Sequence, residues 1–213
     1  MKLPHKTLER KLFKSGYRYV FGVDEVGMGC LAGPVVVCAV AMTNHFYNKY
    51  HRKLRWLRES KLLLPHQREK FATELLKEKD LVYAISSVSH KMIDKINIYQ
   101  AARLGMKNAI KKLKPNFDLK TIVLVDGKTK IKGVEYEQMP IVKGDGKIFA
   151  IACASIIAKV YRDRLMVRFA KHYPGYGFEK HKGYGTKYHQ IKLNALGPCE
   201  IHRRSFAPVR KLV

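Results

Sequence analysis

Near its N-terminus the chain reads YRYVFGVDEV (residues 17–26), GMGCLAGP (27–34) and VVVCAVAM (35–42) without interruption. The first stretch is rich in β-branched and aromatic residues, and the third is a continuous apolar run, so both are predicted to be β-strands. Glycines and a proline dominate the middle stretch, which is therefore predicted to be a turn. The sequence thus predicts two consecutive strands, the second of them buried.

Further strands and helices alternate along the rest of the chain. Short apolar runs predict strands at 81–88 and 121–125. Apolar residues at helical spacing and helix-boundary residues such as Pro65 predict four helices, over 65–79, 93–113, 147–172 and 187–195. This order predicts an α/β protein with a mixed sheet. With 213 residues, no repeat and no linker, we expect one domain over 1–213, with about 173–213 forming a basic helical extension of it.

The charge balance is the unusual feature of the composition. The chain has 42 Lys and Arg against 17 Asp and Glu, a formal net charge of +25, while its 46% hydrophobic content is that of a folded domain. Such a field attracts polyanions, of which nucleic acid is the commonest. Basic residues interleave with tyrosines over 171–211, a pattern that suits a nucleic-acid backbone and stacked bases, although an ordinary solvated basic surface explains it equally well.

Membrane insertion and secretion are not expected. The longest uncharged stretch, 26–48, has a continuous apolar part of only 35–42, well short of the ~20 residues of a spanning helix. The N-terminal segment is basic but lacks the apolar region of a secretory signal. The four cysteines form no C-x-x-C pair and are predicted to be free thiols, which favours a reducing compartment, the cytoplasm.

Four acidic residues stand at the expected ends of strands or helices. Asp24 and Glu25 close the first strand, Asp126 follows the strand at 121–125, and Asp145 precedes the long helix. Carboxylates gathered in so basic a protein are suited to Mg²⁺ or Mn²⁺, and two such ions support phosphodiester hydrolysis. The alternative is that each acid is a surface residue or a helix cap, which is a serious alternative for Asp145.

Ten short motifs, in order along the chain, resemble those of ribonuclease HII and together span about 18–208. They are FGVDEVG (21–27), LAGPVV (31–36), ESKLL (59–63), IDKIN (93–97), VDG (125–127), KGD (143–145), ASIIAK (154–159), RDR (162–164), KGYGT (182–186) and HRRSF (202–206).

The resemblance implies an RNase H-like fold and a metal-dependent endonuclease that works without a membrane or an obligate protein partner, as a monomer. It implies hydrolysis of the RNA strand of RNA–DNA hybrids and cleavage 5′ of single ribonucleotides embedded in duplex DNA, leaving 3′-hydroxyl and 5′-phosphate ends. It also implies that Asp24, Glu25, Asp126 and Asp145 hold two divalent cations, Mn²⁺ or Mg²⁺. The alternatives are a ribonuclease HIII-like nuclease and a non-catalytic basic RNA-binding protein.

The family pattern also suggests substrate-binding residues, with two departures from it. The turn Gly27-Met28-Gly29, expected against the ribose 2′-hydroxyl, has Met28 in place of the usual arginine. Leu62 replaces a usual lysine, which leaves Lys61 as the phosphate-binding candidate. Tyr184 matches the tyrosine that stacks at the RNA–DNA junction, and Lys143 is a further candidate. Arg203 and Arg204 are expected to face the duplex or to be structural, and the sequence does not separate these roles.

Two geometric questions concern the carboxylates. Asp163 competes with Asp145 for the fourth position, but 18 residues of continuous helix would place it roughly 27 Å further along, where it is expected to pair with Lys159. The alternative is a substrate-side role for Asp163, if the helix starts later or bends. Adjacent strand residues point to opposite faces, so Asp24 and Glu25 are expected to converge only if the strand ends or bulges there. A contact through the Glu25 backbone carbonyl is the alternative.

Overall fold

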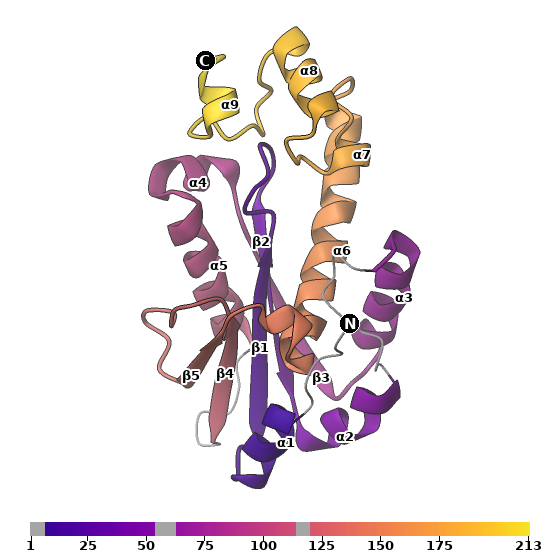
Figure 1. Ribbon diagram of the computed structural model, residues 1–213, viewed down its shortest axis with the longest axis vertical. Coiled ribbons are helices and arrows are strands. Elements are labelled where there is room, and N and C mark those ends of the chain that lie inside the picture. The colour runs from indigo at the N-terminus through magenta and orange to yellow at the C-terminus, as the bar shows by residue number, and fades with distance from the viewer. Residues whose placement is uncertain (1–6, 54–62, 114–119) are drawn as a thin grey trace.

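A five-stranded mixed sheet forms the centre of the structure, a computed structural model that describes residues 7–53, 63–113 and 120–213 (Figure 1). The strand order is β3-β2-β1-β4-β5. Strand β1 pairs antiparallel with β2 and parallel with β4. The strands are β1 (Tyr19–Val26), β2 (Val35–Met42), β3 (Leu81–Val88), β4 (Thr121–Asp126) and β5 (Glu137–Ile141).

The first four strands confirm the strand predictions, and all eight residues of β2 are buried. Strand β5 was not predicted. Its sequence, EQMPI, is neither alternating nor mainly apolar, and none of its residues is fully buried. It lies at the edge of the sheet, where Pro140 is tolerated because one side of the strand makes no ladder hydrogen bonds.

The long helix α6 (Phe149–His172) lies against one face of the sheet, over β1 and β2. Gly22 makes this close approach possible, because a Cβ atom at that position would lie 2.2 Å from the Ala150 carbonyl carbon. Glu9, buried on α1 (Thr7–Lys14), accepts hydrogen bonds from the backbone N–H groups of Phe149 (2.7 Å) and Ala150 (3.2 Å). A distant carboxylate therefore caps the helix, and the interpretation of Asp145 as its N-cap is wrong.

The opposite face of the sheet is covered by α5 (Ile98–Lys112), which is preceded by and packs against α4 (His90–Ile96). The sequence predicted a single helix over 93–113 here. The break falls at Asn97, whose backbone has a positive φ of 64° and an extended ψ of 165°, and whose side chain accepts a hydrogen bond from the N–H of Gln100. Asn97 therefore ends the first helix and caps the second, and the apolar periodicity continues across a real interruption.

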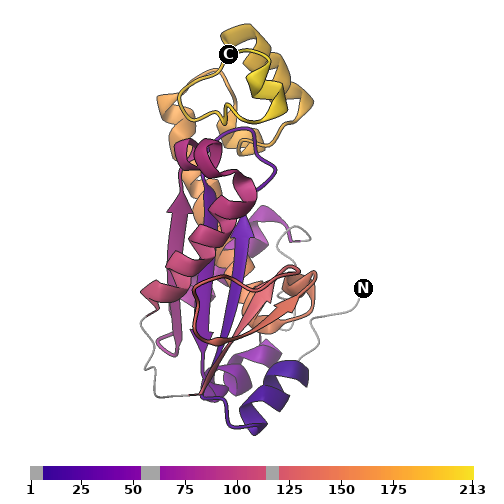
Figure 2. The ribbon, with the colours of Figure 1, turned by 90° about the vertical axis from the view of Figure 1, so that its left-hand side faces the viewer.

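The remaining helices lie around this core (Figure 2). They are α2 (Asn44–Lys53), α3 (Pro65–Leu76), α7 (Phe178–His181), α8 (Lys187–Leu196) and α9 (Ala207–Arg210). Helices α3 and α7 pack against α6, and α8 and α9 lie at the end of the molecule where α6 ends. Isolated β-bridges, Cys30 with Tyr184 and Ala32 with His202, join this last segment to the turn between β1 and β2.

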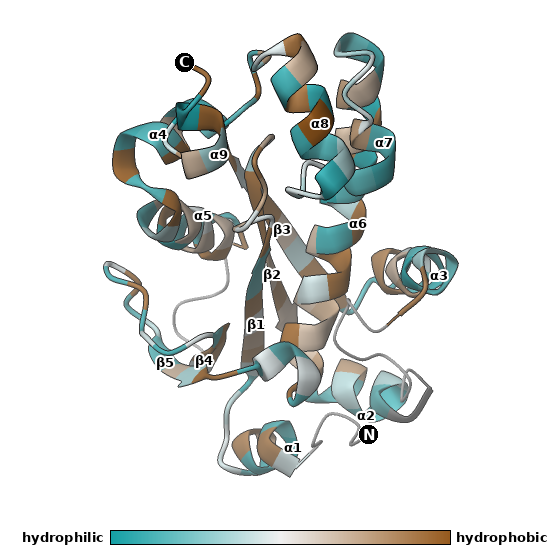
Figure 3. Cartoon of the chain, turned by 45° about the horizontal axis from the view of Figure 1, so that its top comes forward, coloured by the Kyte–Doolittle hydropathy of each residue, from teal (hydrophilic) through white to brown (hydrophobic). Residues whose placement is uncertain are grey.

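Hydrophobic residues dominate the central strands, whereas outer helices such as α3 are mainly hydrophilic (Figure 3). All four cysteines are free, as predicted, and Cys199 is only half-buried. Among the described helices, none has both the length and the apolar character needed to traverse a bilayer.

Candidate active site

The four predicted carboxylates all line one cavity of about 460 Å³, at the C-terminal ends of β1 and β4. The glycine-rich turn that follows β1 and the side of α6 complete its wall. The lining residues are Asp24, Glu25, Val26, Gly27, Met28, Gly29, Arg68, Asp126, Asp145, Ser155, Lys159 and Tyr184.

Parallel pairing brings two of the carboxylates to neighbouring strand ends. Val23 of β1 pairs with Val125 of β4, so the next residues, Asp24 and Asp126, stand side by side. Asp126 Oδ1 accepts a hydrogen bond from the Gly144 N–H (2.6 Å), which ties the 3₁₀ turn Gly144–Gly146 to the end of β4. Asp145 lies in that turn and reaches the same cavity.

The acids form a concentrated negative charge beside a buried group. Asp24 is 5% exposed, and its pKa is raised well above the usual value, first by burial and then by the charges of Glu25, Asp126 and Asp145. Ser155 on α6 opposes the shift through a hydrogen bond to Asp24. A cation among these groups would relieve the repulsion.

As a donor set, these residues fit Mg²⁺ or Mn²⁺, because carboxylate oxygens are the ligands that these hard ions prefer. Across residues 7–53, 63–113 and 120–213, however, no three His, Cys, Asp or Glu side chains are close enough together to hold a metal ion. The oxygen donors are therefore gathered around one cavity without forming a closed ligand cage.

The sequence predicted that Asp24 and Glu25 would converge only if the strand ended or bulged there, but both line the cavity although β1 does neither at these residues. Strand β1 continues regularly through both residues, with Asp24 opposite Cys38 and Glu25 opposite Val37 on β2. The pleat directs their side chains to opposite faces, and Asp24 lies on the face of Ser155 and α6. The cavity borders the strand end itself, so residues of both faces line it.

The turn Gly27-Met28-Gly29 forms the rim of this cavity, and its three residues differ in role. Gly27 has φ +94°, and a Cβ atom there would lie 2.3 Å from Arg162 Nε, so only glycine fits. A Cβ atom on Gly29, which is exposed, would meet nothing within 4 Å. Met28, in the position of the usual arginine, packs against the apolar cluster beneath α4.

Tyr184 stands on the other side of the cavity, half-buried between two cations. Lys159 Nζ lies 5.3 Å from its ring centroid and the Arg162 guanidinium carbon 6.0 Å. Burial raises the pKa of Tyr184 to about 12, so its hydroxyl stays protonated. Its ring is therefore positioned beside the carboxylates as a neutral, partly exposed surface.

Comparison with known proteins matches residues 21–209 of the chain to the family model of ribonuclease HII. The chain belongs to the ribonuclease HII family. A ribonuclease HII of Caldicellulosiruptor bescii is 51% identical over 199 residues, which cover 93% of this chain and 91% of that one. The members of this family are RNase H endonucleases, and this chain is therefore an enzyme of the ribonuclease H class.

Solved structures agree with this assignment. The ribonuclease H2 of Pyrococcus horikoshii superimposes with a TM-score of 0.74 at 28% identity, covering 91% of this chain and 96% of that one. A Bst-RNase HIII in complex with Mn²⁺ has the same fold, with a TM-score of 0.66 at 17% identity, covering 92% of this chain and 70% of that one. The α/β fold predicted from the sequence is thus confirmed as that of ribonucleases HII and HIII.

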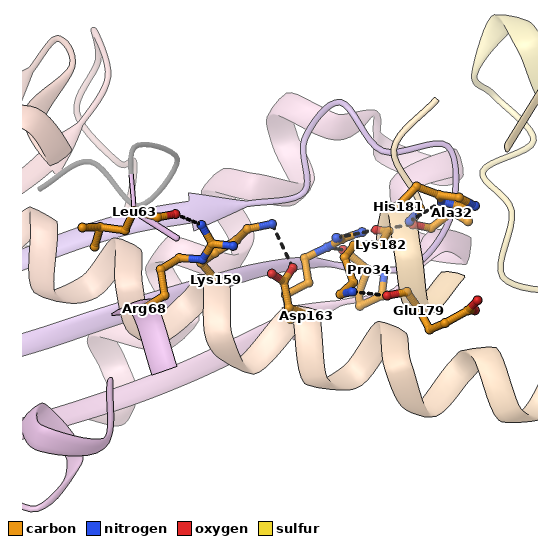
Figure 4. A network of polar contacts seen from close by, with 11 residues as sticks. Ala32, Pro34, Leu63, Arg68, Lys159, Asp163, Glu179, His181 and Lys182 are labelled. Carbon is orange, nitrogen blue, oxygen red and sulfur yellow. Dashed lines mark hydrogen bonds and ion pairs between the residues drawn. The ribbon is translucent and has the colours of Figure 1, made fainter. Parts of the chain in front are cut away.

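Of the remaining residues considered for the site of this ribonuclease HII family member, two lie outside the lining of the cavity and one lies outside the described residues. Asp163 does not line the carboxylate cavity, and it pairs with Lys159 at 2.8 Å as predicted (Figure 4). Lys143 is exposed and likewise outside the lining of that cavity. Lys61 lies outside the described residues.

Sequence reasoning missed three polar lining residues: Arg68, Ser155 and Lys159. Ser155, Lys159 and Asp163 recur every four residues on α6, a spacing that could have indicated a polar stripe. Arg68 on α3 donates to the Leu63 carbonyl at the edge of the cavity (Figure 4). A second cavity of about 510 Å³ shares Arg68, Lys159 and Tyr184 and extends toward Lys182.

Proposed function

We propose that the chain is a metal-dependent endonuclease that hydrolyses the RNA strand of RNA–DNA hybrids and removes ribonucleotides from DNA. It would cut 5′ of a single ribonucleotide embedded in duplex DNA and leave 3′-hydroxyl and 5′-phosphate ends. One observation carries this proposal: four carboxylates, a glycine-rich turn and Tyr184 line the same cavity.

Asp24, Glu25, Asp126 and Asp145 would hold two divalent cations, Mn²⁺ or Mg²⁺. When bound, such ions activate a water molecule and stabilise the leaving oxygen of a phosphodiester. Buried Asp24 would anchor the site, and Asp126 holds the turn that carries Asp145. The Mn²⁺ complex of the similarly folded Bst-RNase HIII supports this choice of metal.

The residues around the acids would orient the substrate. Gly27, Met28 and Gly29 would lie against the ribose 2′-hydroxyl, and Tyr184 would stack at the junction between RNA and DNA. Gly29 supports this role because the space beside it is open. Lys61 and Lys143 would contact phosphates farther from the cut.

The basic C-terminal segment would hold the rest of the duplex. Most Lys and Arg side chains of 171–211 are exposed, which suits contacts to phosphates. Arg203 is buried and would therefore not contact a phosphate. The working form would be a monomer in the cytoplasm, where the free thiols would persist.

The test is cleavage of a labelled DNA duplex that contains one ribonucleotide, with Mn²⁺ and with EDTA, beside an all-DNA duplex. We expect a single metal-dependent cut 5′ of the ribonucleotide, a ligatable 5′-phosphate on the product, and no cut in the all-DNA control. Tight binding without cleavage in Mn²⁺ would contradict the proposal and favour the non-catalytic RNA-binding alternative. A long RNA–DNA hybrid is assayed in parallel, and cleavage of this hybrid without cleavage of the one-ribonucleotide duplex would favour the ribonuclease HIII-like alternative.

A further inference from the structure

Arg203 is fully buried, and the hydrogen bonds of its guanidinium all go to backbone oxygens, while the guanidinium carbon lies 5.1 Å from the centroid of the Phe206 ring. It donates from Nε to the Gly33 carbonyl (3.0 Å), from Nη1 to that of Met28 (2.8 Å) and from Nη2 to that of Gly27 (2.6 Å). No ion pair to Arg203 occurs in the part of the chain that the structure describes. Burial lowers its pKa to about 10, so the group remains charged at neutral pH.

This contact determines which way the peptide groups of the turn face. The structure has no cis peptide bond among its described residues, and in a trans peptide the C=O and the following N–H point in opposite directions. Because Arg203 draws the carbonyls of Gly27 and Met28 inward, the N–H groups of Met28 and Gly29 face away from it. Within the described chain, neither N–H donates to another backbone carbonyl.

Two N–H groups without a backbone acceptor therefore stand at the rim of the carboxylate cavity. All three residues of the turn line that cavity, and open space lies beside Gly29. The charge of Arg203 polarises both peptide groups, which strengthens their N–H groups as donors to an oxygen of the substrate. This arrangement supplies positive potential from behind the turn, although Met28 has no charged side chain of its own.

Arg203 also fixes the turn relative to Tyr184. Its own N–H donates to the Leu31 carbonyl (2.8 Å), and the Leu31 N–H donates to the Gly183 carbonyl (2.8 Å). The residue before Tyr184, the turn and Arg203 are thus joined through consecutive backbone contacts.

We propose that Arg203 is a positioning residue that presents the N–H groups of Met28 and Gly29 to a substrate oxygen at the ribonucleotide, either a phosphate oxygen or the 2′-hydroxyl. This inference rests on the proposed function of the same site. Arg203 itself does not touch the substrate. Its effect passes through the two peptide groups that it holds.

The first test compares Arg203→Lys with Arg18→Lys on the one-ribonucleotide duplex. Lysine keeps the positive charge but lacks the planar fork that spans several carbonyls. Arg18 is exposed at the opposite end of β1 and serves as the matched control. We expect kcat/KM to fall roughly 10- to 100-fold in Arg203→Lys, as small displacements of binding groups do, and to stay unchanged in Arg18→Lys. Equal activities of the two folded variants would overturn the inference.

A second measurement works on the unmodified protein and so does not depend on how well the variant folds. In ¹H–¹⁵N NMR spectra with EDTA, the one-ribonucleotide duplex should shift the amide signals of Met28 and Gly29 more than an all-DNA duplex does. Folded Arg203→Lys should lose this difference while its other duplex-induced shifts remain, which loss of stability alone would not produce. Unmodified protein whose two signals respond equally to both duplexes would overturn the inference. If the unmodified protein cleaves normally in that case, the proposed function stands.

Discussion

The carboxylate cavity and the turn that Arg203 holds are adjacent, but they differ in how their buried charges are balanced. In the cavity, Asp24 is buried beside three groups of the same sign, and its pKa rises as a result. Next to the turn, Arg162 of α6 and Arg203 of the C-terminal segment are buried. Among the described residues neither forms an ion pair, and each donates to three backbone carbonyls. Repulsion between carboxylates around a cavity favours binding of a cation. A buried guanidinium whose hydrogen bonds go to backbone carbonyls instead fixes the conformation of that backbone.

The largest effect should come from removing one charge of the cavity. Asp126→Asn should abolish cleavage while the fold and duplex binding persist, because the amide keeps an oxygen but not the negative charge. The matched control is Asp163→Asn, the competing acid on α6, which should retain most of the activity. Gel assays of the one-ribonucleotide duplex at saturating Mn²⁺ measure both. Near-normal activity of Asp126→Asn would show that the four carboxylates do not form the catalytic site.

Salt should have the next largest effect, through the exposed basic residues of the C-terminal segment. Each phosphate contact releases condensed counterions, so duplex affinity should fall by at least ~10³ between 50 and 200 mM salt. Fluorescence anisotropy in EDTA measures the slope without cleavage. A slope equivalent to one or two contacts would show that this segment does not bind the duplex.

Tyr184→Ala should have a smaller and more selective effect. Loss of one stacking contact is worth about 1–3 kcal/mol, and it should fall mainly on the duplex with a single ribonucleotide, since a long hybrid offers ribose at every register. Tyr184→Phe keeps the ring and should stay close to the unmodified protein. The comparison needs kcat/KM for both variants on both substrates. Equal losses on the two substrates in Tyr184→Ala would leave the tyrosine with a packing role only.

The smallest effect concerns pH and the neutral histidines of the C-terminal segment. His189 donates to the Tyr184 carbonyl (2.9 Å) and contacts His202 through Nε2 (3.1 Å). Burial, above all, lowers the pKa of each to about 4 from the ordinary 6.5. The unfolded chain therefore binds more protons between these values, so stability is complete above about pH 7 and is lost as the pH falls from 6.5 toward 4.

Thermal unfolding from pH 4 to 8 measures this dependence. His202→Gln should flatten the slope between pH 6.5 and 4, whereas His172→Gln, at an exposed position at the end of α6, should leave it unchanged. Identical slopes in the two variants would show that His202 is not among the groups responsible.

The same contrast explains which features could be predicted from the sequence. Asp24 and Asp126 close recognisable apolar strands, and parallel neighbours end at the same edge of a sheet, so their proximity follows from local pattern. Whether Arg203 faces the duplex or the interior depends on how its segment packs on Gly27 and Met28, which lie 176 and 175 residues earlier, and local pattern does not encode this packing. Asn97 interrupts a helix without interrupting its apolar periodicity, and β5 has no strand pattern at all.

Mn²⁺ binding tests the central claim, that the four carboxylates act together as a cation site, more directly than any activity. Isothermal titration calorimetry of the unmodified protein, Asp126→Asn and Asp163→Asn compares them without substrate. We expect the unmodified protein and Asp163→Asn to bind Mn²⁺ with the same affinity and stoichiometry, and Asp126→Asn to lose affinity or a site. Equal Mn²⁺ binding by all three proteins would contradict the account.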